Sequence, residues 1–117
     1  MNKKPKLSIC IITFNHQDFI KDCINGVLNQ KVDFEIEIII GNDFSNDFTT
    51  EICEEFSNKY SFIKHNLRAV NLGMAKNWLK TLSECSGEYI AICEGDDYWI
   101  DPMKLQKQVD FLDSNLK

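Results

Sequence analysis

Four short runs rich in isoleucine, separated by amphipathic stretches, constrain the fold of this chain more than any other feature. The runs are LSICIIT at 7–13, EIEIII at 35–40, SFIKH at 61–65 and YIAIC at 89–93. Their length and composition are typical of β-strands, and the unbroken first run favours a strand that is buried on both faces. Apolar residues recur at helical spacing over 17–30, 48–56, 74–85 and from 102 onwards.

This strict alternation of strand and helix predicts an α/β fold with right-handed crossovers. We expect a Rossmann-like, mostly parallel sheet of about four strands flanked by helices. The chain of 117 residues is about one domain long. Asp101 and Pro102 predict the start of the last helix, as its N-cap and first helical residue. Gly87 is expected at or near the end of the third helix.

Charge and hydropathy exclude several classes of protein. The net charge is −5, which argues against a nucleic-acid partner. The longest apolar runs hold five or six residues, against the roughly 18 that a membrane-spanning helix needs. The start of the chain has no long apolar region, so we expect no signal peptide. Lys3, Lys4 and Lys6 are interpreted as a solvated leader, with contact to an anionic membrane surface as the alternative.

The five cysteines do not form a recognisable framework. Their number is odd, and neither a CxxC pair nor a His-spaced pair is present. Each cysteine falls at an apolar position of a strand or helix pattern. We therefore expect small buried thiols in a reducing compartment, without disulfides or a metal site.

The stretch CEGDDYW places Glu94, Asp96 and Asp97 directly after the fourth predicted strand. In open parallel sheets, ligands bind beyond the carboxyl ends of the strands, so these acids fall on the functional edge. Three carboxylates this close repel one another unless one is protonated or a cation is bound. Mg²⁺ or Mn²⁺ suits such a site, held by one or two carboxylates together with substrate phosphates. The alternative is a solvated acidic turn before a helix.

Other polar residues belong to the same edge. TFN at 13–15 follows the first strand and GNDFSND at 41–47 follows the second. Asp43 is either a turn or cap residue, or a group that accepts a hydrogen bond from a nucleobase or a ribose hydroxyl. His16 and His65 are interpreted as ordinary surface or loop residues, with ligand contact as the alternative for His16. The motifs GxGxxG, GxxxxGK[ST] and GxSxG are absent from the sequence.

With these residues in place, the sequence resembles the family 2 glycosyltransferases, which have the GT-A fold. The resemblance covers almost the whole chain, from about Leu7 to Leu116. It rests on four stretches in the family's order: LSICIITFNHQDFIKDCINGVLNQ, FEIEIIIGNDFSND, NLGMAKNWLKTLSECSGEYIAICEGDD and DYWIDPMKLQKQVDFLD. The variant EGDDYW resembles a subgroup used in bacterial surface-polysaccharide assembly.

The resemblance implies seven donor-site residues, namely Thr13, Phe14, Asn15, Asp43, Lys76, Asp96 and Asp97. By this resemblance the first three line the nucleotide pocket, Asp43 contacts the base, and Lys76 lies near the base or the phosphates. Asp96 and Asp97 match the end of the family's DXD motif, which holds the ribose and a divalent metal, Mn²⁺ or Mg²⁺.

Three positions depart from the family pattern. Asn42 replaces the first Asp of the turn after the second strand, and Phe44 replaces a usual Gly or Asn. Glu94 stands where Asp is common, so we do not expect it to contact the metal directly. Two additional residues between Asn77 and Gly87 blur the alignment of Lys76.

The resemblance implies an inverting, metal-assisted glycosyltransferase that takes a sugar from a nucleotide-sugar donor, with UDP favoured. The acceptor is expected to be a polysaccharide or a lipid-linked saccharide. The family's catalytic base is expected downstream of Lys117. Residues 1–117 are thus interpreted as the donor-binding portion, truncated before the acceptor part and inactive by itself. We expect the full-length protein in the cytoplasm, with peripheral association at the inner face of the membrane as an alternative.

Three other functions are weighed against this one. A non-catalytic nucleotide-sugar-binding or interaction module would share every residue named above. A phosphoacceptor signalling domain would need an acidic pair after the first strand, where this chain has TFN. A nucleotidyltransferase usually carries a Gly-rich loop with a basic residue at that same place.

Overall fold

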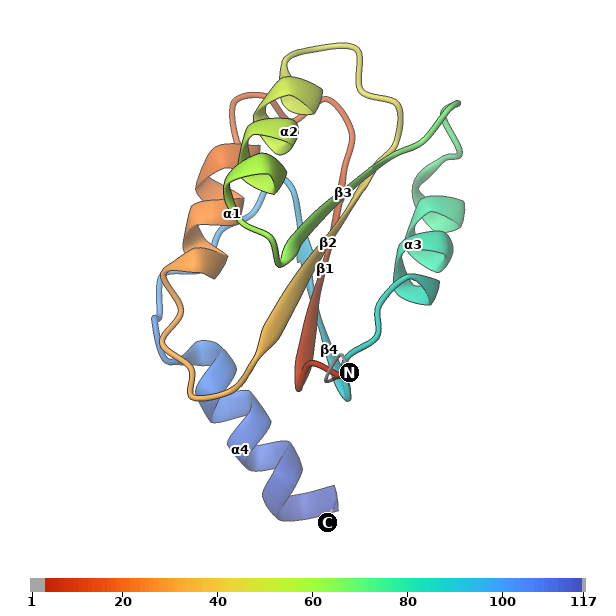
Figure 1. The fold of residues 1–117 in the computed structure, drawn as a ribbon. Coiled ribbons are helices and arrows are strands. Elements are labelled where there is room, and N and C mark those ends of the chain that lie inside the picture. The colour runs from red at the N-terminus through yellow and green to blue at the C-terminus, as the bar shows by residue number, and fades with distance from the viewer. Residues whose placement is uncertain (1–3, 117) are drawn as a thin grey trace.

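The computed structural model describes residues 4–116, which form one parallel sheet with helices on both faces (Figure 1). The strands are β1 (Leu7–Thr13), β2 (Ile36–Asn42), β3 (Ile63–Leu67) and β4 (Tyr89–Glu94), in the spatial order β3-β2-β1-β4. The helices are α1 (Ile20–Leu28), α2 (Thr49–Lys59), α3 (Met74–Ser83) and α4 (Lys104–Leu116). All three strand pairs are parallel, which confirms the predicted α/β architecture.

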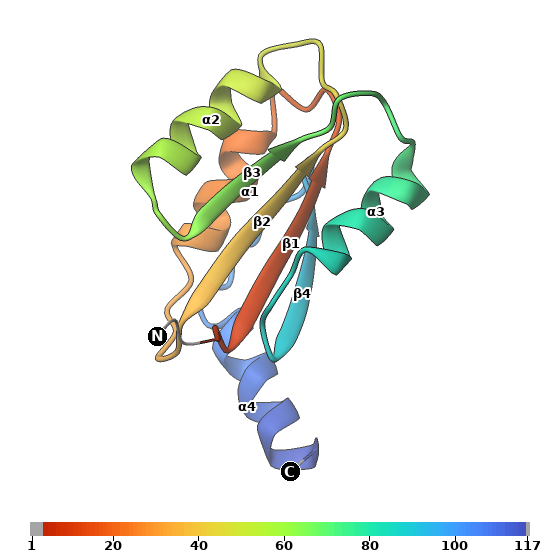
Figure 2. The same ribbon diagram turned by 45° about the vertical axis from the view of Figure 1, so that its right-hand side comes forward.

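The helices divide unequally between the two faces of the sheet. Figures 1 and 2 show α1, α2 and α4 on one side and α3 alone on the other. Every residue of β1 is buried, as expected for a central strand that is covered on both faces. The core on the α1 side joins alternate isoleucines of the central strands to the apolar stripe of α1; its members include Ile9, Ile11, Ile38, Ile40, Ile20, Ile24 and Val27.

The strand register brings the ends of the strands to one edge. Thr13 pairs with Asn42, Ile12 with Glu94, and Asn42 with Leu67. The loops that follow β1, β2, β3 and β4 therefore leave the sheet at the same end, at the top of Figure 1. Within residues 4–116, no helix combines the length and apolarity needed to cross a membrane.

Several predicted boundaries are wrong because tertiary contacts decide them. Strand β3 lies two residues later than the predicted 61–65, and α1 is shorter than the predicted 17–30. Helix α4 begins at Lys104 rather than Pro102. Asp101 still caps its first turn, since Asp101 Oδ1 accepts a hydrogen bond from the Met103 N–H at 2.9 Å.

Gly87 does not end a helix, because α3 stops at Ser83. Its N–H instead donates to Ser8 Oγ at 2.7 Å. A Cβ at Gly87 would lie 2.5 Å from the Ser8 backbone nitrogen. The glycine therefore allows the chain that enters β4 to pass directly against β1.

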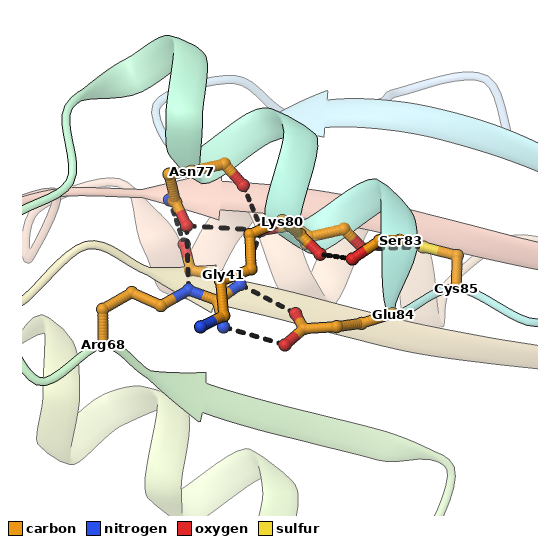
Figure 3. A network of polar contacts seen from close by, with 8 residues as sticks. Gly41, Arg68, Asn77, Lys80, Ser83, Glu84 and Cys85 are labelled. Carbon is orange, nitrogen blue, oxygen red and sulfur yellow. Dashed lines mark hydrogen bonds and ion pairs between the residues drawn. The ribbon is translucent and has the colours of Figure 1, made fainter.

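Helix α3 is fixed to the sheet by a buried polar network around Arg68 (Figure 3). Its guanidinium donates to both carboxylate oxygens of Glu84, at 2.9 and 2.7 Å, and to Asn77 Oδ1 at 3.0 Å. Asn77 Nδ2 in turn donates to the Gly41 carbonyl at 2.9 Å. This network joins the end of β3 to α3 and β2, so α3 keeps a fixed position beside the carboxyl edge of the sheet.

All five cysteines are free thiols, as expected. Four are buried and Cys85 is half-buried. Cys23 Sγ lies 3.5 Å from Cys93 Sγ in the core. Burial raises the pKa of Cys53 to about 12, which keeps that thiol protonated.

Candidate functional site

A cavity of about 290 Å³ opens at the carboxyl edge of the sheet, between the strand ends and the N-terminus of α3. It lies where ligands bind in open parallel sheets. Apolar and polar side chains share its wall, namely Ile12, Thr13, Phe14, His16, Asp43, Asn71, Gly73, Met74, Asn77, Glu94 and Asp96. The positive end of the α3 dipole faces this space, and the first turn of α3 has no acidic residue to offset it.

A second groove, of about 390 Å³, runs between β4 and α4. Apolar side chains such as Leu7, Ala91 and Leu112 form most of its wall. Ligand sites combine an apolar wall with a few convergent polar groups. The cavity at the carboxyl edge has that combination, so it is the candidate site.

The acidic turn after β4 packs directly against the end of β1. The Gly95 N–H donates to the Ile12 carbonyl at 2.9 Å. A Cβ at Gly95 would lie 2.6 Å from Thr13 Oγ1 and 2.7 Å from His16 Nδ1. These two atoms lie 2.9 Å from each other, so Thr13 fixes the His16 ring. Only a residue without a side chain brings the acidic turn this close to them.

Asp43 is buried and holds the loop that follows β3. Its two carboxylate oxygens accept hydrogen bonds from the backbone N–H groups of Leu72, at 2.6 Å, and Gly73, at 2.9 Å. The Asn71 side chain donates to the Asp43 carbonyl at 3.1 Å. The loop thereby becomes a wall of the cavity, a structural role for Asp43 that the sequence did not predict. Each carboxylate oxygen keeps lone-pair capacity for a ligand.

Glu94 and Asp96 place two carboxylates on the wall of the same cavity. Both side chains are exposed. Within residues 4–116, no three His, Cys, Asp or Glu side chains come together as a metal site. Mg²⁺ needs fewer, since it commonly takes one or two carboxylates and completes its shell with water and phosphate oxygens. Glu94 and Asp96 are thus carboxylates of the kind that could hold a divalent cation, and the expectation that Glu94 does not contact the metal directly stays a prediction.

Four of the seven predicted donor-site residues line the cavity, namely Thr13, Phe14, Asp43 and Asp96. Asp97 lies on a neighbouring shallow hollow of about 530 Å³, which it shares with Asp96 and Glu94. Its Oδ1 accepts a hydrogen bond from the Tyr98 N–H at 2.8 Å.

Asn15 and Lys76 lie outside the cavity wall. Asn15 is exposed, with φ at 54°, and it links two loops. Its N–H donates to Ser45 Oγ at 3.0 Å, and its Oδ1 accepts from the Asn46 N–H at 2.9 Å. Lys76 is exposed on α3, next to the buried Asn77. The predicted ligand contacts of Asn15 and Lys76 stay predictions.

The wall also includes residues that were not predicted from the sequence, among them Asn71, Met74 and Asn77. The signal for the loop was present, because the residues after β3 belong to the same edge of the sheet. His16 lines the cavity, which was the alternative considered for it. The interpretation of His65 as a surface or loop residue is wrong, because it lies in β3 and its side chain is only 1% exposed.

The family described as Glycosyl transferase family 2 matches residues 8–117. A cholesterol galactosyltransferase of Borreliella burgdorferi is 41% identical over 98 residues, which make up 80% of this chain and 26% of that protein. The abequosyltransferase RfbV of Salmonella typhimurium is 36% identical over 93 residues, which cover 78% of this chain and 28% of RfbV. The chain thus spans less than a third of the length of these two relatives.

Solved structures agree with the sequence match. TarS 1–349 of S. aureus in complex with UDP superposes with a TM-score of 0.82 at 28% identity, over 95% of this chain and 33% of that one. The mannosyltransferase PcManGT of Pyrobaculum calidifontis, in complex with GDP-Man and Mn²⁺, shares the fold with a TM-score of 0.81 at 18% identity, over 95% of this chain and 33% of that one. The family match over residues 8–117, with this fold and this cavity, shows that the chain belongs to glycosyl transferase family 2 and has the GT-A architecture.

Proposed function

We propose that residues 1–117 are the donor-binding portion of an inverting glycosyltransferase that uses a nucleoside-diphosphate sugar, with UDP as the nucleotide. One observation carries the proposal: the cavity at the carboxyl edge gathers Thr13, Asp43 and Asp96 around one space. Further support comes from TarS, which is 28% identical and whose structure holds UDP.

The side chains of the cavity suit the parts of such a donor. Phe14 is 43% exposed at the wall, so its ring is free to stack on a nucleobase. Asp43 accepts from the base or a ribose hydroxyl with its remaining lone pairs. The N-terminus of α3 faces the space where the diphosphate would lie and favours its negative charge.

The acidic turn provides the metal-binding part of the proposal. Asp96, with Asp97 or Glu94 as the second carboxylate, would hold Mg²⁺ or Mn²⁺, which would supply positive charge to the diphosphate. Without a cation, these carboxylates and the diphosphate would repel one another. Donor binding is therefore expected to depend on a divalent metal.

The sugar, the acceptor and the location are proposals for the whole protein. The two named relatives transfer different sugars, galactose and abequose, so family membership alone does not set the sugar. We propose a saccharide or lipid-linked acceptor, and a cytoplasmic protein that contacts the inner face of the membrane peripherally.

Of the lysines considered for membrane contact, Lys3 lies outside the described residues. Lys6 forms ion pairs with Glu88 at 3.1 Å and Asp113 at 2.9 Å, so much of its charge is engaged within the chain.

Calorimetric titration of UDP into the chain, with and without Mn²⁺, tests the proposal. We expect saturable binding of UDP that depends on Mn²⁺. Asp96→Asn should lower the affinity for UDP by about tenfold or more, a loss of about 1.4 kcal/mol in binding free energy. Asp33→Asn is the matched control, because this exposed acid precedes β2, outside the residues that line the cavity. A folded chain that binds no UDP under either condition would contradict the proposal. Binding by a full-length protein that transfers no sugar would favour the non-catalytic module.

A further inference from the structure

A chain of hydrogen-bonded side chains connects α2 and β3 to the turn that carries Asp43. We propose that Glu54, His65 and Asn42 form a hydrogen-bonded relay that positions this turn for donor binding, with His65 as its central positioning residue. The inference rests on the proposed function. It concerns residues that lie behind the cavity rather than on its wall.

The relay consists of short contacts between three elements. His65 Nδ1, in β3, lies 2.5 Å from Glu54 Oε1 on α2. His65 Nε2 lies 3.0 Å from Asn42 Nδ2, at the end of β2. Asn42 is fully buried, and the His65 side chain is 1% exposed. Water therefore has little access to either side chain, and the partners within the protein decide their orientation.

Hydrogen-bond counting fixes the state of each group in the relay. Asn42 Oδ1 accepts from both the N–H and the hydroxyl of Ser45, at 3.1 and 2.7 Å. The Asn42 amide nitrogen must then face His65, and it is purely a donor. His65 Nε2 consequently acts as the acceptor. A neutral imidazole with this arrangement carries its hydrogen on Nδ1, where the Glu54 carboxylate accepts it.

The same contacts hold the backbone of the donor site. Phe44 adopts φ of 64°, a left-handed conformation that is unfavourable for a non-glycine residue and needs support from its surroundings. That support comes from the Ser45 hydroxyl. It donates a hydrogen bond to Asn42 Oδ1 and accepts one from the Asn15 N–H. Asp43 lies between Asn42 and Phe44. Asn42 therefore determines the direction in which Asp43 leaves the sheet.

Two substitutions of His65 separate positioning from packing. In His65→Gln the side-chain oxygen can accept from Asn42 in place of Nε2, whereas His65→Leu keeps bulk and removes the acceptor. We expect UDP affinity within about threefold of wild type for His65→Gln and about tenfold weaker for His65→Leu, a loss of about 1.4 kcal/mol. Ile63→Ala, at a buried position of the same strand, is the control for general destabilisation and should keep its affinity.

The tautomer of His65 provides a readout that does not depend on UDP. Long-range ¹⁵N–¹H spectra of the histidine rings should show the Nδ1–H tautomer in wild type. Asn42→Asp replaces the donor that faces Nε2 with an acceptor and should place a hydrogen on Nε2. An Nε2–H or doubly protonated ring in wild type at neutral pH would overturn the relay.

The two readouts keep the relay and the proposed function distinguishable. Equal UDP affinity in wild type and His65→Leu would overturn the positioning role even if the tautomer is as expected. If folded wild type binds no UDP, the proposed function fails and the positioning role fails with it. The spectrum then still decides whether the relay exists.

Discussion

At the scale of single residues, the shape of the cavity depends strongly on Gly95. The residue is buried between the end of β1 and the acidic turn. Its φ is not in the left-handed region, so the requirement for glycine is one of space rather than of backbone conformation. Thr13 and His16 occupy the volume that a methyl group would need.

Gly95→Ala should therefore damage the site more than the fold. The new methyl group would push Thr13 and His16 or the acidic turn away, and overpacking of this kind costs about 1–3 kcal/mol of stability. We expect UDP affinity, in titrations with Mn²⁺, to fall by about tenfold or more, which is about 1.4 kcal/mol. Gly87→Ala is the control. Its methyl group would lie about as close to β1, but just before β4 and outside the residues that line the cavity. Undiminished UDP affinity in Gly95→Ala would show that the turn adjusts freely.

The sequence identified those site residues that come directly after strands. Thr13, Phe14, Asp43 and Asp96 lie at strand ends or in the turns that follow them, and the register of a parallel sheet brings these positions together. The bond between Asp43 and the loop after β3 involves backbone N–H groups, which every residue has. No pattern of side chains could have indicated it.

At the scale of elements, apolar periodicity was sufficient to find every strand and helix, but not their ends. Helix α4 begins where Gln30, two residues after the end of α1, accepts a hydrogen bond from the Leu105 N–H at 2.9 Å. Gln30 Nε2 also donates to the Asp101 carbonyl at 2.6 Å. The start of this helix thus depends on a residue more than 70 positions away, and local sequence signals placed it two residues too early.

The ion pair that anchors α3 predicts a specific dependence of stability on pH. Hydrogen bonds from Arg68 lower the pKa of Glu84 below its ordinary value, although burial of the carboxyl opposes them. A carboxyl whose folded-state pKa is depressed stabilises the fold above its unfolded pKa of about 4.3, and this contribution is lost as the pH falls through the folded pKa.

We expect Glu84→Gln to lower the free energy of unfolding by about 2 kcal/mol at pH 7, as for a hydrogen-bonded charged group. The difference from wild type should shrink as the pH falls below about 4. Urea unfolding at several pH values measures it, with Glu55→Gln, an exposed position on α2, as the control. A difference in the free energy of unfolding that stays constant down to pH 3 would contradict this prediction. It would mean that Arg68 does not lower the pKa of Glu84.

At the scale of the whole molecule, the sheet is covered unevenly. Helix α3 packs on β1 and β2, so the same face of β4 lacks a covering helix among residues 4–116. Ile90 and Ile92 point to this face and are 44% and 55% exposed. In the described part of the chain, β4 also pairs only with β1, so its other edge has unpaired backbone groups. An exposed apolar edge strand of this kind is a template for association.

The chain of 117 residues should therefore self-associate through β4, since burial of the two isoleucines and pairing of the free edge both favour it. Sedimentation velocity over concentrations from about 10 µM to 1 mM should show an increasing weight-average mass, because such contacts form in the micromolar to millimolar range. The double variant Ile90→Lys with Ile92→Lys should remain monomeric, because charged side chains on an edge strand oppose pairing. Phe48→Lys removes another exposed apolar side chain, at the start of α2, and should associate like wild type. A wild-type chain that stays monomeric up to the highest concentration would show that the net charge of −5 is sufficient to keep these edges apart.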